Sequence, residues 1–278
     1  MCRWLGYFGD PIPLEEVLFD APHSLIEQSR HAREMASAQN ADGFGLGWYR
    51  DSRERPGVYR SVFPAWNDAN LRDLAAQIRS PLFLAHVRAA TGTPVQQTNC
   101  HPFRHGRWIF VHNGFIDRFS EVRRELMLAI DPEYFPEIQG TTDSEIVFYL
   151  ALTFGLTDDP LDALEKMAGF VEAVGHDHGI EEPLQMTIGI SNGERLYAAR
   201  YASGPTVNTL YVSEDARAVR MLYPENDRLT KLSDEARVIV SEPLADLPGL
   251  WHEVGKGEAM IVQEGPDVLL PFRPRVPV

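Results

Sequence analysis

The order of the predicted elements restricts the fold of this chain more than any other feature. Two helices are predicted in succession, one beginning near Thr142 and one over 161–174, and strands then follow one another beyond Pro183. Strand–helix–strand alternation, which would indicate a parallel sheet, is absent from this pattern. The order therefore predicts an α+β fold with antiparallel sheets. Because no linker-like composition interrupts it, we expect a single domain over residues 2–278. Earlier strands are expected at 5–8, 41–49, 82–87 and 108–112, and earlier helices at 25–35 and 119–130. Later strands are expected at 184–190, 196–201, 209–212, 236–241 and 259–262.

Two local patterns predict how particular strands pack. Asn192-Gly193 separates two apolar runs, which is typical of a hairpin with a type I′ turn. In 43–49, glycines alternate with large apolar residues, which indicates a strand in close contact with another backbone. Pro11 and Pro13 are expected to end the first strand.

Composition excludes several classes of function. The 278 residues are 44% hydrophobic and carry a net charge of −14, which argues against a nucleic-acid partner. Apolar runs are too short to span a bilayer, and the start lacks the layout of a secretory signal. With only two cysteines, Cys2 and Cys100, a disulfide framework is not expected. We therefore expect a cytoplasmic protein without a membrane or nucleic-acid partner.

A cysteine occupies the second position of the chain. Once Met1 is removed, Cys2 carries a thiol and a free α-amine on one residue. Such an amine has a pKa of about 7.7–8.0, which suits it to accept the thiol proton at neutral pH. Cys2 is therefore a candidate nucleophile with its own base. The alternative interpretation is that a cysteine occurs at this position by chance.

Polar residues at the ends of apolar strands are candidates for a binding pocket. Arg88 follows 82–87 and is suited either to hold a carboxylate through two hydrogen bonds or to form a surface ion pair. Asn113-Gly114 follows 108–112 and is suited either to donate to an oxyanion or to form a turn.

Acidic and histidine side chains add further candidates. Asp143 lies at a predicted helix start, where it either caps the helix or offers a counter-charge to an ammonium group. His101 and His112 are candidates for acid–base work or metal binding, although a lone histidine beside aromatic residues is more often structural. The pair His176 and His178 lacks further ligands at metal-binding spacing, so neither a metal nor a cofactor is expected.

Taken together, these segments resemble the class II glutamine amidotransferases, the cysteine branch of the N-terminal nucleophile hydrolases. The matching motifs occur in family order across essentially the whole chain. The stretches 1–9, 22–25 and 41–49 look most like stand-alone members such as the γ-glutamyl amidohydrolase of ergothioneine biosynthesis. The motifs are Met1-Cys2, 86–91 (HVRAAT), 99–103 (NCHPF), 112–114 (HNG), 142–145 (TDSE) and 240–243 (VSEP).

The resemblance implies a fold and a catalytic mechanism. The expected fold is a four-layer αββα sandwich. Cys2 would attack the δ-carbonyl of glutamine or of a γ-glutamyl group, forming a thioester, and its α-amine would act first as base and then as acid. Asn113 and Gly114 would form the oxyanion hole.

The resemblance also implies substrate-binding residues. Arg88 would hold the α-carboxylate and Asp143 the α-ammonium, while Thr91 would line that end of the pocket. His101 would support the site rather than accept the proton.

This chain departs from the better-known amidotransferases at two positions. Ala89 and Gly92 stand where those proteins carry Trp and His, so the pocket wall is altered. The first expectation is hydrolysis of a γ-amide, with ammonia passing to water or to a separate synthase subunit. A γ-glutamyl hydrolase with a bulky leaving group, which Ala89 and Gly92 would make room for, and a non-catalytic glutamine-sensing module remain as alternatives.

Overall fold

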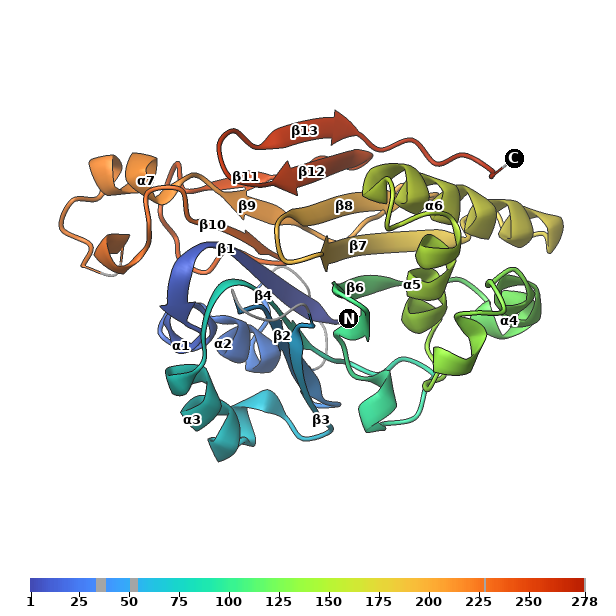
Figure 1. The fold of residues 1–278 in the computed structure, drawn as a ribbon, viewed down its shortest axis with the longest axis horizontal. Helices are drawn as coiled ribbons and strands as arrows, with labels where there is room; N and C mark the ends of the chain where they lie inside the picture. The colour runs from blue at the N-terminus through green and yellow to red at the C-terminus, as the bar shows by residue number, and fades with distance from the viewer. Residues whose placement is uncertain (34–38, 51–54, 228, 278) are drawn as a thin grey trace.

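The computed structural model describes residues 1–33, 39–50, 55–227 and 229–277. Two antiparallel sheets form its centre (Figure 1). The seven-stranded sheet has the order β11 (Trp251–Glu253), β9 (Tyr211–Ser213), β10 (Arg237–Val240), β1 (Arg3–Pro13), β4 (Arg79–Val87), β2 (Phe44–Trp48) and β3 (Gly57–Ser61). The six-stranded sheet has the order β13 (Val268–Pro271), β12 (Glu258–Val262), β8 (Leu196–Ala202), β7 (Leu184–Ser191), β6 (Trp108–Ile116) and β5 (Phe103–His105).

Three apolar layers hold four layers of secondary structure together. Trp4, Leu84, Ile109 and Val111 belong to the cluster between the two sheets. A second cluster joins the outer face of the seven-stranded sheet to α1 (Glu15–Leu18), α2 (Leu25–Arg30) and α3 (Ala69–Gln77). A third joins the six-stranded sheet to α4 (Phe119–Leu128), α5 (Asp143–Thr153) and α6 (Pro160–Asp177). The chain thus has the expected α+β, four-layer αββα architecture, with α7 (Ala216–Leu222) beside β9 and β10 (Figure 1).

The glycines of β2 allow a close contact between the sheets. A Cβ on Gly45 would overlap the backbone oxygen of His101, and one on Gly47 would lie 2.8 Å from the ring of Pro102. The prediction of close backbone packing from alternating glycines is therefore confirmed. This contact brings the segment that contains His101 against β2.

Some local predictions are wrong for identifiable reasons. The loop between β7 and β8 has four residues, because Ser191 pairs with Leu196, and Asn192 does not adopt the positive φ that a type I′ turn requires. The strand β1 continues to Pro13 after a register irregularity between Phe8 and Ile12, so the prolines interrupt pairing without ending the strand. The helix α2 begins after its cap, Ser24, as predicted but ends at Arg30. Met35, its expected end, lies outside the described residues.

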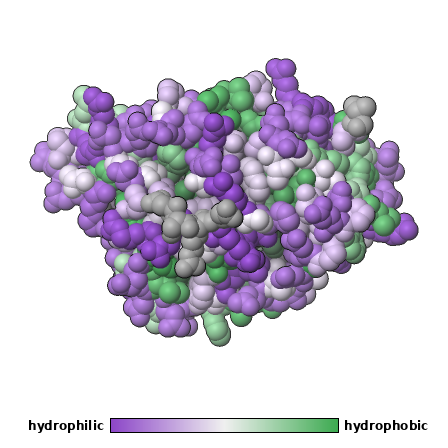
Figure 2. Space-filling view, viewed as in Figure 1, coloured by the Kyte–Doolittle hydropathy of each residue, from purple (hydrophilic) through white to green (hydrophobic). Residues whose placement is uncertain are grey.

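The surface of the molecule is mixed in character. On the face shown in Figure 2, hydrophobic residues form small separate patches among hydrophilic ones. Within the described parts of the chain, no helix combines the length and apolar character needed to cross a bilayer.

Candidate active site

A cavity of about 810 Å³ opens at the start of β1, where β4 and β6 end and α5 begins. In Figure 1 the N-terminus lies at this place, beside β4 and β6. The start of the chain, the segment after β4, the end of β6 and the first turns of α4 and α5 therefore supply its wall. The predicted site residues that line it are Cys2, Arg88, Thr91, His101, Gly114 and Asp143, and Asn113 directly precedes Gly114 in β6.

Strand pairing fixes the position of Cys2. The next residue, Arg3, pairs with Val87 at the end of β4, and the Cys2 thiol donates to the Ala89 carbonyl with an Sγ–O distance of 3.6 Å. Burial raises the pKa of the Cys2 thiol, while the charge of Arg88 acts in the opposite direction. A base beside the thiol is therefore needed to form the thiolate.

A buried ion network holds the residue after Cys2. Arg3 Nε and Nη2 each lie 2.8 Å from Oε1 of Glu242, and His23 Nε2 lies 3.1 Å from Oε2. Burial by itself raises the pKa of Glu242, but hydrogen bonds from His23 and the Arg33 amide and the charge of Arg3 together lower it to about 2. The N-terminal strand is thus fixed by a carboxylate that stays ionised.

Met1 precedes Cys2 and lines the same cavity. Its carbonyl oxygen accepts from Asn40 Nδ2 at 2.7 Å and from Arg3 Nη1 at 3.2 Å. While Met1 is attached, the nitrogen of Cys2 belongs to a peptide bond and cannot act as an amine base. Formation of the nucleophile–base pair therefore requires the removal of Met1.

Arg88 is a buried cation without a carboxylate partner among the described residues. Its side chain is 3% exposed, and its guanidinium donates to Thr93 Oγ1 at 2.7 Å and to the carbonyls of Pro94 at 3.3 Å and Asp42 at 3.4 Å. These acceptors are neutral. A buried cation is costly unless an anion offsets it, so the site is suited to a ligand carboxylate.

Asp143 is the first residue of α5, one position after the cap. The cap is Thr142, whose hydroxyl accepts from the Glu145 amide at 3.2 Å, so the capping interpretation of Asp143 is wrong. Asp143 accepts instead from the amides of Ile116 at 2.9 Å and Ser144 at 2.7 Å. It has no cationic partner in the described chain, and its carboxylate lines the cavity. Backbone amides thus hold the carboxylate in place and leave its charge for a ligand.

Asn113 and Gly114 lie inside β6 rather than in a turn. Asn113 pairs with Thr187 of β7, and a Cβ on Gly114 would overlap the carbonyl of Gln185. Asn208 donates its side-chain amide to Asn113 Oδ1 at 3.1 Å, which leaves Asn113 Nδ2 as the atom able to donate. Sequence reasoning missed Asn208, because no motif surrounds it and it lies 95 residues from Asn113.

The histidines near the cavity are buried and neutral. The rings of His101 and His86 stack with centroids 4.1 Å apart, and His112 Nδ1 lies 2.8 Å from the hydroxyl of Ser144. Burial lowers the pKa of His101 far below its usual range and that of His86 to about 3. Neither nitrogen of His101 has a hydrogen-bond partner among the residues that the structure describes. Such rings are poorly suited to accept the thiol proton, and no cluster of metal-ligating side chains forms among the described residues.

Part of the cavity wall is aromatic and comes from the end of β6 and from α4. Phe115 and Phe119 contribute aromatic surface, while Ser120 and Arg123 add polar groups from the first turns of α4. Arg123 forms no ion pair with a described residue. Sequence reasoning missed this wall, since the helical spacing of 119–130 indicates the helix but not the face that borders a pocket.

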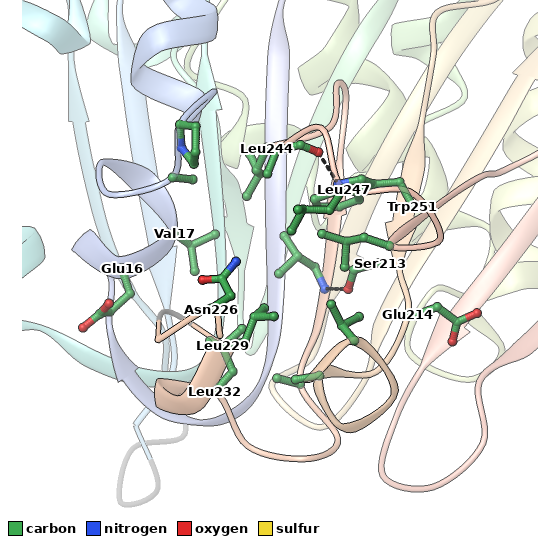
Figure 3. Close-up of a pocket in the computed structure, with 18 of the residues that line it drawn as sticks. Glu16, Val17, Ser213, Glu214, Asn226, Leu229, Leu232, Leu244, Leu247 and Trp251 are labelled. Carbon is green, nitrogen blue, oxygen red and sulfur yellow. Dashed lines mark hydrogen bonds between the residues drawn. The ribbon is translucent and has the colours of Figure 1, made fainter. Parts of the chain in front are cut away.

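A second cavity, of about 470 Å³, lies on the other side of the seven-stranded sheet. Figure 3 shows Val17, Leu229 and Leu244 around it, with Glu16 and Glu214 at its margins. Its lining is mainly apolar and contains no cysteine, histidine or arginine. The groups suited to amide chemistry are in the cavity of Cys2.

Comparisons with known proteins agree with this fold. A protein of the glutamine aminotransferase class II domain from Silicibacter pomeroyi superposes with a TM-score of 0.74 and 32% identity, over 98% of this chain and all of that one. The glutamine phosphoribosylpyrophosphate amidotransferase of B. subtilis shares the fold at 16% identity, with a TM-score of 0.66 over 99% of this chain and 50% of that one. The fold is that of an amidotransferase domain of the N-terminal nucleophile type.

Sequence comparisons specify the family. The model of the class II glutamine amidotransferases matches residues 21–276. The probable glutamine amidotransferase DUG3 of Saccharomyces cerevisiae is 31% identical over 98% of this chain and 84% of its own. A γ-glutamyl-hercynylcysteine sulfoxide hydrolase of Mycolicibacterium smegmatis is 29% identical over 98% of this chain and all of its own. The chain belongs to the class II glutamine amidotransferases, which confirms the resemblance seen in the sequence.

Proposed function

We propose that this protein hydrolyses a γ-glutamyl amide bond through a thioester on Cys2. The α-amine, free after loss of Met1, accepts the thiol proton, and the sulfur adds to the δ-carbonyl. The tetrahedral intermediate collapses by breaking the C–N bond, and the α-ammonium protonates the leaving nitrogen. Water then adds to the thioester with the amine as base, which releases glutamate and restores the thiol.

The observation that supports this proposal most strongly is the placement beside Cys2 of two charged groups that form no ion pair with the described residues. Arg88 faces neutral acceptors and Asp143 faces backbone amides, yet both line the cavity of the thiol. A glutamyl group carries an α-carboxylate and an α-ammonium at one end and the amide at the other. We assign the carboxylate to Arg88 and the ammonium to Asp143, with Thr91 lining that end and His101 forming the wall.

The oxyanion hole is assigned to Asn113 and Gly114. Asn208 orients the Asn113 amide so that Nδ2 donates, and the Gly114 amide is the second donor. Preorganised donors of this kind stabilise the tetrahedral intermediate more than the ground-state carbonyl.

The size and lining of the cavity favour a leaving group larger than ammonia. At about 810 Å³ the space exceeds what glutamine fills, and Ala89 and Gly92 lie in its wall. Phe115, Phe119 and Arg123 also line this cavity and add aromatic and cationic groups that suit a substrate with an apolar part and a carboxylate. A γ-glutamyl hydrolase with a bulky leaving group is therefore the second candidate within the same chemistry.

Three further expectations belong to this proposal. Residues 2–278 form one amidotransferase domain, since β1 and β10 pair across most of the chain length. The protein is cytoplasmic, in keeping with the free thiols of Cys2 and Cys100. If ammonia is the leaving group, water or a separate synthase subunit accepts it.

Intact mass spectrometry with 6-diazo-5-oxo-norleucine, an electrophilic analogue of glutamine, tests the proposal. We expect a protein without Met1 that gains one adduct, and we expect Cys2→Ala to gain none. Cys100→Ala is the matched control, because Cys100 is buried outside the cavity and should leave labelling intact. Processed protein without an adduct would direct attention to larger γ-glutamyl substrates. Retained Met1 without turnover would favour a glutamine-sensing module instead.

A further inference from the structure

Three arginines surround a third cavity, which lies between the edge strands of the two sheets. Arg60 belongs to β3, the last strand of the seven-stranded sheet, and Arg104 belongs to β5, the last strand of the six-stranded sheet. Arg55 lies just before β3. The cavity measures about 480 Å³ and shares no lining residue with the cavity of Cys2.

The hydrogen-bonding capacity of these guanidinium groups is largely unused. Arg60 Nη1 donates to the Cys100 carbonyl at 3.4 Å, and Arg104 Nη1 donates to the Pro56 carbonyl at 3.0 Å. None of the three arginines forms an ion pair with a residue that the structure describes. Each guanidinium has five N–H donors, so most of them have no hydrogen-bond partner among the described residues.

The nearby carboxylates are bound to other groups. Glu145 accepts from the amides of Gln139 at 3.0 Å and Gly140 at 2.7 Å, and Glu137 lies 2.9 Å from His105 Nδ1. Both acids line the cavity, yet neither forms an ion pair with an arginine. The cluster is therefore not explained by internal ion pairing.

Charge repulsion within the cluster supports a role in ligand binding. Burial, followed by the charges of Arg55 and Arg60, lowers the pKa of Arg104. In a chain with 40 acidic and 26 basic residues, three neighbouring cations without an ion pair among the described residues are an unfavourable arrangement, which the charge of Glu145 near Arg60 offsets only in part. An anion bound between them would remove that cost.

We propose that Arg55, Arg60 and Arg104 form a binding site for a small molecule that carries a phosphate group. A tetrahedral phosphate dianion accepts hydrogen bonds in several directions and so accommodates guanidinium groups from three positions at once. A carboxylate accepts hydrogen bonds in a single plane and therefore binds at most two guanidinium groups. The cavity volume is that of a small-molecule site rather than of a macromolecular interface.

Isothermal titration of the full-length protein at constant ionic strength tests this site, with inorganic phosphate, AMP and citrate as probes. We expect phosphate or AMP to bind, and the double variant R60Q/R104Q to weaken binding at least tenfold. Phosphate binding as tight as AMP binding would indicate the free anion, and tighter AMP binding would indicate a phosphorylated metabolite. Because the readout is binding, the result does not depend on the activity of Cys2.

The matched control is Arg195→Gln, since Arg195 is exposed in the β7–β8 loop and also lacks an ion pair among the described residues. It should bind the probes like the parent. Circular dichroism and thermal unfolding establish that each variant is folded. The proposal is overturned if the parent binds neither phosphate nor AMP up to about 10 mM, a limit that corresponds to negligible affinity. Equal binding by the folded double variant, or tighter binding of citrate than of phosphate, would also overturn it.

Discussion

The side-chain amide of Asn208 donates to Oδ1 of Asn113, and this single contact sets the direction in which the Asn113 amide can donate. Asn208→Ala should therefore lower kcat on a γ-glutamyl anilide about tenfold with little change in KM, because the donor remains but loses its orientation. Loss of the donor itself in Asn113→Ala should cost on the order of 100-fold or more. Steady-state kinetics on the processed enzyme measure both effects.

Asn192 provides the control for these variants, because it precedes the other Asn-Gly pair of the chain. Its side chain accepts from the amides of Glu194 and Arg195 in the β7–β8 loop. Asn192 does not line the cavity of Cys2. Asn192→Ala should keep the parental kcat. An unchanged kcat for Asn208→Ala would contradict the assignment of Asn113 as an oxyanion donor.

Arg88→Lys should raise KM for a γ-glutamyl substrate about 10- to 100-fold and change kcat much less. A lysine keeps the charge but offers no fork to the α-carboxylate, and a charged hydrogen bond contributes about 1.5–3 kcal/mol. Arg107→Lys is the control, since Arg107 is an exposed partner of Glu194. Kinetics at several substrate concentrations separate the two constants. A fall in kcat alone would argue that Arg88 does not bind the substrate.

The buried histidines should make the protein less stable as the pH falls below about 6.5, the usual pKa of histidine in an unfolded chain. Burial lowers the pKa of His86 to about 3 and also lowers the pKa values of His101 and His112. As the pH falls, these histidines therefore bind protons in the unfolded chain before they do so in the folded protein. The free energy of unfolding keeps its full value above about pH 6.5 and falls as the pH drops toward 3. For three histidines it falls by at most about 4 kcal/mol per pH unit. Urea unfolding between about pH 7 and 5 measures it. A flat profile would contradict the buried neutral rings, and His31→Asn, at an exposed site, should keep the slope.

Glu242 should stabilise the fold in a lower pH range. Its pKa of about 2 lies below the value of about 4.3 expected in the unfolded chain, so its contribution is present above pH 4.3 and is lost as the pH falls toward 2. Glu242→Gln should lower the free energy of unfolding by about 3 kcal/mol near neutral pH, because Arg3 would remain buried without its counter-charge. Chemical denaturation measures this difference.

Asp246→Asn is the matched control for Glu242. The ion pair of Asp246 with Arg33 is exposed, and its loss should cost less than about 0.5 kcal/mol. Similar losses for the two variants would contradict the role of the buried network.

The fold could be predicted where local signals are strong. Long apolar runs, with Gly and Pro near their ends, locate β4, β6, β7, β8, α5 and α6. The missed elements have weak patterns: β3 is only five residues long and mostly half-buried, and α3 buries only Leu71 and Ala75. The error in the β7–β8 loop has a similar origin, because the side chain of Asn192 supports a four-residue loop that the dipeptide alone does not reveal.

The site could be predicted only in part for a different reason. Cys2, Arg88 and Asn113 lie in recognisable segments, but the residues that orient them come from distant parts of the chain. Glu242 lies in the recognised segment 240–243, but no local pattern specifies its contact with Arg3 or the contact of Asn208 with Asn113. Sequence reasoning therefore found groups suited to chemistry and missed the contacts that position them.

The ion network of Glu242 also determines when the nucleophile is assembled during synthesis. Ribosomes add about 5–20 residues per second, so roughly ten to fifty seconds separate translation of Cys2 from translation of Glu242. Throughout that interval β1 can pair with β4, but Arg3 lacks the carboxylate that neutralises it in the folded chain. The buried network that holds the residue after Cys2 is thus completed only when the last quarter of the protein emerges.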